Sequence, residues 1–597
     1  MVLTGIDDVT IGMLSVLSLL PIIAVALFLV VLRWPASRAM PICYLIAVVL
    51  ALFVWKIPAL RVAAASVKGL VIAGSLLYIV LGAILLLNTL QESGGLRSIR
   101  RGFMNITPDR RIQVIIIAWL FGSLMEAVAG FGTPAAICVP LLVGLGFPPL
   151  AAVTSGMIIQ STPVSFGAAG TPILVGVNDG LSSGPTVHDY ASQMGWSQWT
   201  DFLGMIAAKV ALLHAVAGML IPLIVVCFLT RFFGKNKSFR EGLRVWKFAL
   251  FASLAMVIPY VIVAHTLGPE FPSLFGSLVG LAIVTTAARK GFLMPSKENH
   301  WDFDEKENWD SQWSGRIEIS VDDKNDNTMN LVKAWLPYLF VALFLFLTRW
   351  KALPLAKWVS WKVELSDLFG TGITAKFQPF YLPGFIFILV SIITLFLHKI
   401  DWISYKRAWR NSIKTGLAAS VALVFTVPMV QVFINSDGGA ANYAKMPIAL
   451  AEGVAALAGS AWPIFAPFIG GIGAFVAGSN TISNMMFSLF QFDVGQRIGV
   501  DPTWIVALQA VGGAAGNMIC VHNVVAASAV VGLLGKEGLV IRKTLLPFVY
   551  YALLVGATGY SIVWFSKYGV LNLGTVITVL IAVAAVAIIH YGAKYEL

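Results

Sequence analysis

Two matched pairs of glycine-rich motifs interrupt the apolar sequence of this chain. The first pair is VAGFGT (residues 128–133) and GAAGTP (167–172), and the second pair is VAGSNT (476–481) and GAAGNM (513–518). Gly130 and Gly170 are 40 residues apart, and Gly478 and Gly516 are 38 residues apart, so the pairs share spacing as well as letters. Secondary transporters use duplicated, interrupted membrane helices to build a substrate site near the bilayer midplane. The motifs therefore favour a carrier.

The composition around these motifs is that of a membrane protein. Hydrophobic residues make up 58% of the 597 residues, and charged residues only 12%. Many windows of about 20 apolar residues are long enough to cross the hydrocarbon core of a bilayer. Examples are residues 11–32, 69–90, 201–230, 415–434 and 546–565. We expect an all-α polytopic membrane protein with about 12 to 14 transmembrane segments.

The positive charge of the chain is concentrated in short loops. The formal net charge is +12, and the basic residues gather in loops 97–111, 231–247, 399–414 and 536–543. Basic loops beside apolar segments usually face the cytoplasm, so we place these four loops there and do not expect a nucleic-acid partner. Residues 178–200 contain no Lys or Arg, and we place them outside.

Loop charge and motif order together predict an inverted repeat. In the first membrane half (1–294), a re-entrant hairpin (112–146) opens to the cytoplasm and precedes a broken helix (148–177). In the second half (331–597), a hairpin (460–498) opens outward and precedes a broken helix (502–534). Such irregular backbone is tolerated at membrane depth where protein or a wet cavity covers it. A polar, mostly acidic segment (295–330) is predicted to be a solvated linker between the halves.

The interruptions are the candidate substrate site. A broken helix exposes backbone N–H groups and a partial positive charge at its N-terminal end, and anions bind there readily. A single such motif is weak evidence, because small residues are also common where membrane helices pack closely, but two matched pairs favour binding. We expect a small carboxylate or other oxyanion to bind there. The predicted binding residues are Gly130, Phe131, Gly132, Thr133, Gly167, Ala168, Gly170, Thr171, Ser479, Asn480, Thr481, Gly516, Asn517 and His522.

Two ionisable residues near the interruptions are candidates for proton coupling. Glu126 directly precedes the first motif, and ionisable residues inside membranes are functional candidates. The alternative for Glu126 is an interfacial carboxylate that solvates the hairpin tip. His522 follows Gly516 by six residues and titrates near neutral pH unless it is a packed neutral histidine.

Other classes of function lack their motifs. The sequence contains no GxxxxGK[ST], no HExxH and no CxxC. We therefore expect no enzyme activity, no metal site and no cofactor other than protons. A channel remains an alternative, as does a membrane sensor that binds a metabolite without moving it and uses the linker as its output.

The same motifs resemble the signatures of the lactate permease family. The matching stretches are EAVAGFGTPAAICVPLLVGLGFPPLAA (126–152), STPVSFGAAGTPI (161–173), GSNTISNMMF (478–487), VGGAAGNMI (511–519) and VVGLLGKEG (530–538). The resemblance implies proton-coupled symport of L-lactate, D-lactate or glycolate in the plasma (inner) membrane. It also implies an elevator-type transporter, and it leaves a homo-oligomer open.

The chain departs from the family's pattern inside the candidate site. Asn480 and Asn517 stand where the family usually has an aspartate and a lysine, and Val521 and His522 replace its Pro-Gln. The site therefore lacks both members of a charged pair. A different small organic anion is the alternative substrate.

Overall fold

The computed structural model describes residues 8–28, 32, 34, 36–104, 106–130, 133–315, 329–349, 353–533 and 536–594. Within these residues, nine helical segments of at least 18 residues are apolar enough to cross a membrane. Shorter apolar helices accompany them, including Pro383–Leu397. The chain is therefore a multi-pass, predominantly helical membrane protein, as its composition predicted. The number of crossings stays a prediction.

The elements are named in chain order. Before residue 295 the helices are α1 (Asp8–Ala26), α2 (Ala36–Val49), α3 (Ala59–Glu92), α4 (Gly95–Met104), α5 (Arg110–Val114), α6 (Gly122–Ala129), α7 (Thr133–Gly144), α8 (Pro149–Ile158), α9 (Gly167–Thr171), α10 (Asn178–Leu181), α11 (Pro185–Gln193), α12 (Trp199–Gly218), α13 (Ile221–Phe233), α14 (Phe239–Leu243), α15 (Trp246–Thr266) and α16 (Pro272–Arg289). After residue 330 they are α17 (Leu331–Arg349), α18 (Leu355–Val359), α19 (Pro383–Leu397), α20 (Trp402–Ile434), α21 (Met446–Ala458), α22 (Trp462–Ala477), α23 (Asn480–Arg497), α24 (Pro502–Gly516), α25 (Val521–Ala529), α26 (Glu537–Val563), α27 (Phe565–Tyr568) and α28 (Leu573–Lys594). Short turns of other helix types are η2 (Leu50–Val54), η3 (Ile115–Phe121), η4 (Val164–Phe166), η5 (Pro172–Val177), η6 (Lys297–Asn299), η7 (Lys306–Asn308), η8 (Leu368–Gly370) and η9 (Gly459–Ala461), and the strands are β1 (Val363–Leu365) and β2 (Ala375–Phe377).

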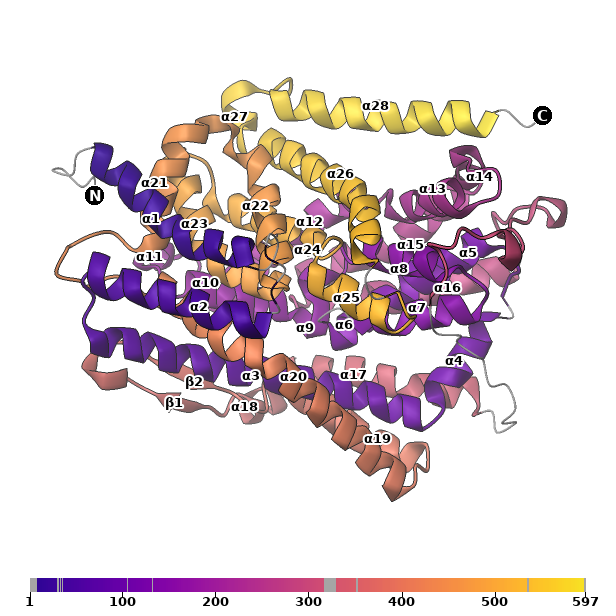
Figure 1. The fold of residues 1–597 in the computed structure, drawn as a ribbon, viewed down its shortest axis with the longest axis horizontal. Helices are drawn as coiled ribbons and strands as arrows, with labels where there is room; N and C mark the ends of the chain where they lie inside the picture. The colour runs from indigo at the N-terminus through magenta and orange to yellow at the C-terminus, as the bar shows by residue number, and fades with distance from the viewer. Residues whose placement is uncertain are drawn as a thin grey trace.

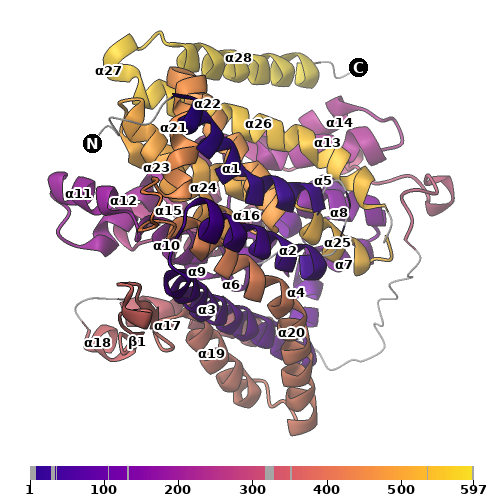
Figure 2. The same cartoon turned by 60° about the vertical axis from the view of Figure 1, so that its left-hand side comes forward.

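One layer of the molecule is built on the long helix α3. This helix packs along α20 and α19, while α2 packs on α20 and α17 packs on α4 and α19. We call α2, α3, α4, α17, α19 and α20 the flanking layer; α3, α17, α19 and α20 lie along the lower side of Figures 1 and 2. Glycines allow the close approach. A Cβ on Gly69 would lie 2.5 Å from Cα of Pro428 in α20, and one on Gly82 would lie 2.5 Å from the carbonyl oxygen of Gly384 in α19.

The interrupted helices form a central body beside this layer. There α22 packs on α23, α24 and α26, α23 packs on α24 and η5, and α6 packs on α7, α9 and α16. The residues of α23 and α24 are almost entirely buried. Within residues 480–491 of α23, the buried side chains nevertheless include six polar ones: Asn480, Thr481, Ser483, Asn484, Ser488 and Gln491. Such burial of polar residues indicates that the body is built around a polar interior.

The outermost helix, α28, contacts the rest of the molecule along one side only. It packs on α26 and runs along the top edge of Figure 1. Its apolar side chains are largely exposed, among them Leu580 (61%), Val583 (59%) and Val586 (66%). In a membrane protein such a surface faces lipid.

The four basic loops gather at one end of the molecule. The neighbouring elements α4, α14 and the turn from α19 to α20 lie toward the right of Figure 1, whereas α11, β1 and β2 lie toward the left. Much of this basic sequence is helical: α4 covers residues 95–104, and α20 begins at Trp402, so that it includes most of loop 399–414. The shared end agrees with the grouping of these loops by charge.

Residues 295–315 contact the central body at several points, although their described side chains are exposed or half-buried, and the linker role stays a prediction. The indole Nε1 of Trp301 donates to Oε2 of Glu241 at 2.8 Å, and its carbonyl accepts from the backbone N–H of Arg110 at 3.1 Å. The carbonyl of Trp313 accepts from the backbone N–H of Leu150 at 3.1 Å. The tryptophans of this acidic segment therefore fix it to the end of the body that carries α5, α8 and α14. Residues 316–328 lie outside the described part of the chain.

A second unexpected element is a short two-stranded ribbon between α18 and α19. Strands β1 and β2 are antiparallel, with Glu364 opposite Lys376. The Lys362 and Lys376 ammonium groups contact the Glu364 carboxylate at 2.5 and 3.5 Å. This exposed ribbon lies at the end of the molecule opposite the basic loops (Figure 1).

Candidate functional site

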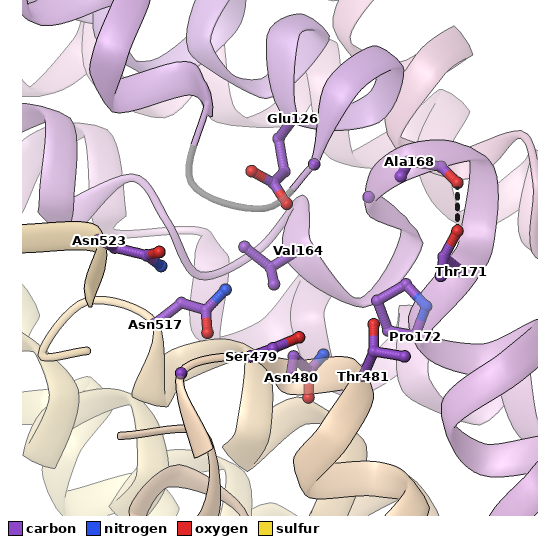
Figure 3. Close-up of a pocket in the computed structure, with 13 residues that line it drawn as sticks. Glu126, Val164, Ala168, Thr171, Pro172, Ser479, Asn480, Thr481, Asn517 and Asn523 are labelled. Atoms are coloured by element: carbon purple, nitrogen blue, oxygen red, sulfur yellow. Dashed lines mark hydrogen bonds between the residues drawn. The ribbon is translucent and has the colours of Figure 1, made fainter. Parts of the chain in front are cut away.

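The four interruptions meet at one buried pocket (Figure 3). The free space between its lining atoms, including space open to the surroundings, is about 310 Å³. Its lining comprises Glu126, Gly130, Val164, Gly167, Ala168, Thr171, Pro172, Gly478, Ser479, Asn480, Thr481, Asn517 and Asn523. These residues belong to the central body, to which we also assign η4 and α25 because they pack on α24 and α26, and none comes from the flanking layer. Segments more than 300 residues apart in the sequence thus build a single small site.

The first motif ends helix α6. Gly130, at the C-terminal end of this helix, has a φ of +61°, and its N–H donates to the carbonyl of Glu126 at 2.9 Å. A side chain there would be strained by this φ, and an added Cβ would also lie 2.8 Å from Cβ of Ala168. The end of α6 therefore lies directly against the GAAG segment, and only glycine permits that approach.

The second motif is an irregular turn with left-handed backbone. After η4 the chain passes through Ala168, Ala169 and Gly170 with φ values of 42°, 50° and 79°, and helical structure resumes at Thr171. For an alanine this conformation costs about 1–2 kcal/mol, and such strain concentrates at functional sites. The Thr171 hydroxyl donates to the carbonyl of Ala168 at 2.6 Å and closes the turn (Figure 3). The beginning of η5, at Thr171 and Pro172, thereby faces the pocket.

A buried hydrogen-bond network supports this turn from behind. Nε2 of His214 lies 2.8 Å from Oγ of Ser165, and its Nδ1 lies 2.6 Å from the hydroxyl of Tyr551. The Tyr551 hydroxyl also contacts Oγ1 of Thr162 at 3.0 Å, and Tyr260 donates to the Thr162 carbonyl at 2.8 Å. Three helices, α12, α15 and α26, thus hold residues 162–165 in place.

The third motif presents the N-terminal end of a long helix. Helix α22 ends at Gly478, which has a φ of +79°, and α23 begins at Asn480 after the extended residue Ser479. The Ser479 side chain forms no capping hydrogen bond to α23. The first N–H groups of this 18-residue helix and its partial positive charge are therefore available to a ligand in the pocket.

The fourth motif lies in helix α24, which continues through all four GAAG residues and ends at Gly516. Gly513 to Gly516 are helical, and the interruption covers residues 517–520, between α24 and α25. Two glycines of this motif serve packing. A Cβ on Gly513 would collide with Oδ1 of Asn480, and one on Gly516 would collide with the carbonyl oxygen of Gly471 in α22. Asn517 follows directly and lines the pocket.

Several polar atoms around the pocket have no hydrogen-bond partner among the described residues. They are Oε2 of Glu126, both amide atoms of Asn480, Oδ1 of Asn484 and Oδ1 of Asn517. Glu126, Asn480 and Asn517 are at most 4% exposed. Figure 3 shows Glu126 on one side of the pocket and Ser479, Asn480 and Asn517 on the other. Since buried polar atoms are nearly always paired, this cluster points to a polar ligand or ordered water.

Glu126 is the one ionisable side chain among the described lining residues. It is 2% exposed, and its carboxyl group packs on Gly167. No Lys, Arg or His lines the pocket among these residues, so positive potential there comes from helix N-terminal ends and amide N–H groups. The arrangement suits a small anion and, at Glu126, a proton.

The residues predicted from the sequence fall into three groups. Gly130, Gly167, Ala168, Thr171, Ser479, Asn480, Thr481, Asn517 and Glu126 line the pocket. Gly170 and Gly516 do not line it: a Cβ on Gly170 would collide with the carbonyl oxygen of Pro269, so both glycines serve close packing. Phe131 and Gly132 lie outside the described residues, as do the side chains of Thr133 and His522.

Gly478, which belongs to the hairpin tip 478–481 that we expected to bind substrate, also lines the pocket. Three lining residues were not predicted: Val164, Pro172 and Asn523. Pro172 belongs to the motif GAAGTP and could have been included on that ground. Val164 lies in the quoted stretch 161–173 but outside the glycine-rich motif, and Asn523 lies outside every quoted stretch. Asn523 donates to Oε1 of Gln160 at 3.1 Å, a contact between distant segments that no local pattern reveals.

Fold and pocket together define a multi-pass membrane protein whose interrupted helices line a small polar pocket. The chain belongs to the L-lactate permease family, whose profile matches residues 15–565, and it is therefore a transporter rather than an enzyme.

Individual relatives resemble the chain over nearly its whole length. It is 29% identical over 563 residues to the protein named "Putative L-lactate permease" of Haemophilus influenzae (strain ATCC 51907 / DSM 11121 / KW20 / Rd). The aligned region covers 90% of this chain and 96% of that protein. It is 26% identical over 563 residues to the L-lactate permease of Escherichia coli (strain K12), with 91% and 94% covered. It is also 26% identical over 582 residues to the glycolate permease GlcA of the same strain, with 91% and 95% covered.

Proposed function

We propose that this protein takes up L-lactate, or a related 2-hydroxy-monocarboxylate such as glycolate or D-lactate, together with protons across the plasma (inner) membrane. The observation that carries the proposal is the set of unpaired buried polar atoms of Asn480, Asn517 and Glu126 around one small pocket. The relatives include both lactate and glycolate permeases, which supports this substrate class.

The two ends of such a substrate match two kinds of group in the pocket. A carboxylate accepts hydrogen bonds from the first N–H groups of α23 and from the Asn480 amide, which act without a formal positive charge. A 2-hydroxyl group both donates and accepts, and Oδ1 of Asn517 is an acceptor without a partner. Binding would therefore satisfy the buried atoms that the protein leaves unpaired.

Glu126 is the proposed site of proton coupling. Two negative charges, the substrate carboxylate and the ionised Glu126, would repel each other in a buried pocket of low dielectric constant. Protonation of Glu126 removes this repulsion, so that the anion and the proton bind together more favourably than either binds alone. The coupling of proton and substrate then follows from the proximity of Glu126 to the bound carboxylate. His522 stays the other candidate for the proton.

We further propose the inverted-repeat architecture with two re-entrant hairpins (112–146 and 460–498) and an elevator-type movement. The lining supports it, because the pocket residues all belong to the central body and none to the flanking layer. A body that contains its whole pocket can carry the substrate while the flanking layer stays fixed. The four basic loops would then face the cytoplasm.

A competition experiment tests the substrate class. Uptake of labelled L-lactate by proteoliposomes is measured in the presence of an excess of unlabelled glycolate, D-lactate, acetate or a dicarboxylate. We expect the 2-hydroxy-monocarboxylates to compete best, because acetate lacks the hydroxyl that pairs with Asn517. Strongest competition by a dicarboxylate would instead indicate a carrier for a different organic anion, and binding without any uptake would indicate a sensor.

A further inference from the structure

A second pocket lies between the central body and the flanking layer. It lies between α16 on one side and α4 and α17 on the other, and its free space, open solvent included, is about 870 Å³. Its lining is mainly apolar and includes Leu278 and Leu281 of α16 and Leu331, Trp335 and Leu339 of α17. None of these residues takes part in the polar pocket described above.

The surroundings of this second pocket are apolar and open. On α16, Ile283 and Val279 are 43% and 37% exposed, and on α17, Val332 and Leu339 are 68% and 47% exposed. Such side chains on the outside of a membrane protein contact lipid. The pocket is therefore a recess that the surrounding bilayer can fill.

One charged residue interrupts the apolar lining. Arg289, at the C-terminal end of α16, lines the pocket, is exposed, and forms no ion pair within the described part of the chain. The remaining polar lining residue, Thr285, uses its hydroxyl to donate to the carbonyl of Leu281. A ligand of this pocket would thus meet a guanidinium group at one end and hydrocarbon elsewhere.

Helix α4 carries further positive charge at the same end of the molecule, although Arg97 does not line the recess. Ile99 of this helix is buried and lines the pocket, whereas Arg97 is exposed. Helices α4 and α16 both lie toward the end of the molecule that carries the basic loops (Figure 1). Basic residues beside a recess between membrane helices favour lipids with an anionic head group.

We propose that this pocket binds an anionic phospholipid, with an acyl chain along Leu278, Leu281 and Leu339 and the phosphate at Arg289. Charge complementarity selects the head group, since a guanidinium group forms bidentate hydrogen bonds with phosphate. The lipid would contact both the central body and the flanking layer. On the side of the body, α16 packs on α6, which carries Glu126, and on the side of the flanking layer, α17 packs on α4 and α19.

Lipid binding by the purified protein tests the head-group contact. Native mass spectrometry in detergent would measure retention of phosphatidylglycerol and of phosphatidylcholine with the same acyl chains. We expect the wild type to prefer phosphatidylglycerol and Arg289→Gln to reduce this preference roughly fivefold, the effect of one basic residue near an anionic lipid head group. The matched control is Lys290→Gln, because Lys290 is exposed and adjacent but does not line the pocket. Equal losses in both variants would overturn the proposal, since they would indicate general surface attraction.

A second pair of variants tests the acyl-chain contact. Ala282→Trp fills the pocket from α16 and should abolish lipid retention, whereas Ile283→Trp, on the exposed face outside the lining, should bind as the wild type does. Glycerol phosphate, which has the head-group phosphate but no acyl chain, should not raise the thermal unfolding temperature. Undiminished retention in Ala282→Trp, or stabilisation by glycerol phosphate alone, would contradict a phospholipid site here.

Discussion

The carboxyl group of Glu126 packs directly against the backbone of Gly167. A Cβ added to Gly167 would lie 2.5 Å from Oε1 of Glu126 and 3.2 Å from its Cδ. Glu126 lies in the last turn of α6, the helix of one interruption, and Gly167 begins the turn of the next. The proposed proton site is therefore in contact with the backbone that shapes the substrate pocket.

Gly167→Ala tests this contact. The added methyl group would displace the Glu126 carboxyl, and overpacking of this kind costs about 1–3 kcal/mol. We expect transport to fall strongly and the thermal unfolding temperature to fall by a few degrees. Gly74→Ala in α3 is the matched control, because nothing lies within 4 Å of a Cβ there. Normal transport by Gly167→Ala would show that the position of the carboxyl does not matter.

Glu126→Gln separates proton coupling from substrate movement. The amide keeps the shape of the side chain but cannot take up a proton in transport. We expect loss of lactate accumulation driven by a proton gradient, whereas exchange of internal for external lactate continues. Both are measured on the same proteoliposomes, so exchange also shows that the variant is folded. Retained accumulation would assign coupling to another group, with His522 the next to test.

Asn480→Ala removes two polar atoms that have no hydrogen-bond partner among the described residues. A hydrogen bond to a charged ligand is worth about 1.5–3 kcal/mol, so lactate affinity should fall about tenfold to a hundredfold. Thermal stability without substrate should change little, because no hydrogen bond within the protein is lost. Asn572→Ala provides the contrast: Asn572 donates to two carbonyls, so stability rather than affinity should fall there. Unchanged affinity in Asn480→Ala would remove this residue from the site.

Asn517→Ala tests the proposed hydroxyl contact. Its unpaired Oδ1 should accept from the substrate hydroxyl, so the variant should discriminate less between lactate and propionate, which lacks the 2-hydroxyl. The ratio of the two inhibition constants for labelled lactate uptake measures this. A ratio equal to that of the wild type would place the hydroxyl elsewhere.

Asp501→Asn tests a contact between α12 and the start of α24. This contact lies away from the pocket. Nζ of Lys209 lies 2.6 Å from Oδ2 of Asp501, and the Tyr190 hydroxyl donates to Oδ1 at 3.1 Å. Burial raises the pKa of Asp501, but the Lys209 ammonium and the hydrogen bonds from Thr503 outweigh it, so the pKa is lowered overall. The ionised form is thus favoured in the folded state.

The sign of the pH dependence follows from this lowered pKa. The stabilisation by Asp501 is present above its ordinary pKa of 3.8 and is lost as the pH falls below that value. Asp501→Asn should therefore unfold at a lower temperature than the wild type at pH 7, and the difference should shrink below about pH 4. Glu364→Gln, in an exposed ion pair, should have little effect. A difference that does not depend on pH would contradict the assigned ion pair.

The sequence predicted the interruptions because glycine positions carry direct backbone information. Gly130 and Gly478 have positive φ values, which other residues adopt at a cost, so these letters mark the helix ends reliably. The apolar windows likewise predicted helices that cross a membrane. Both signals are local, and they remain visible in a single sequence.

Contacts between distant segments were not visible in this way. Gly170 and Gly516 belong to the same motifs but support packing against Pro269 and Gly471, and only the tertiary structure separates packing glycines from pocket glycines. The acidic segment around Trp301 was predicted to be a solvated linker because its composition is polar; its described side chains are exposed or half-buried, but its contacts with the body were not predicted. Its tryptophans find hydrogen-bond partners on α14 and beside α5, which composition does not encode.

The most direct test of the proposed function is uptake of labelled L-lactate into proteoliposomes that contain only this protein, with and without an inward proton gradient. We predict accumulation above the external concentration that requires the gradient and is lost in Glu126→Gln. Absence of lactate uptake by folded protein, with or without the gradient, would contradict lactate transport. Uptake that does not respond to the gradient would contradict coupling to protons.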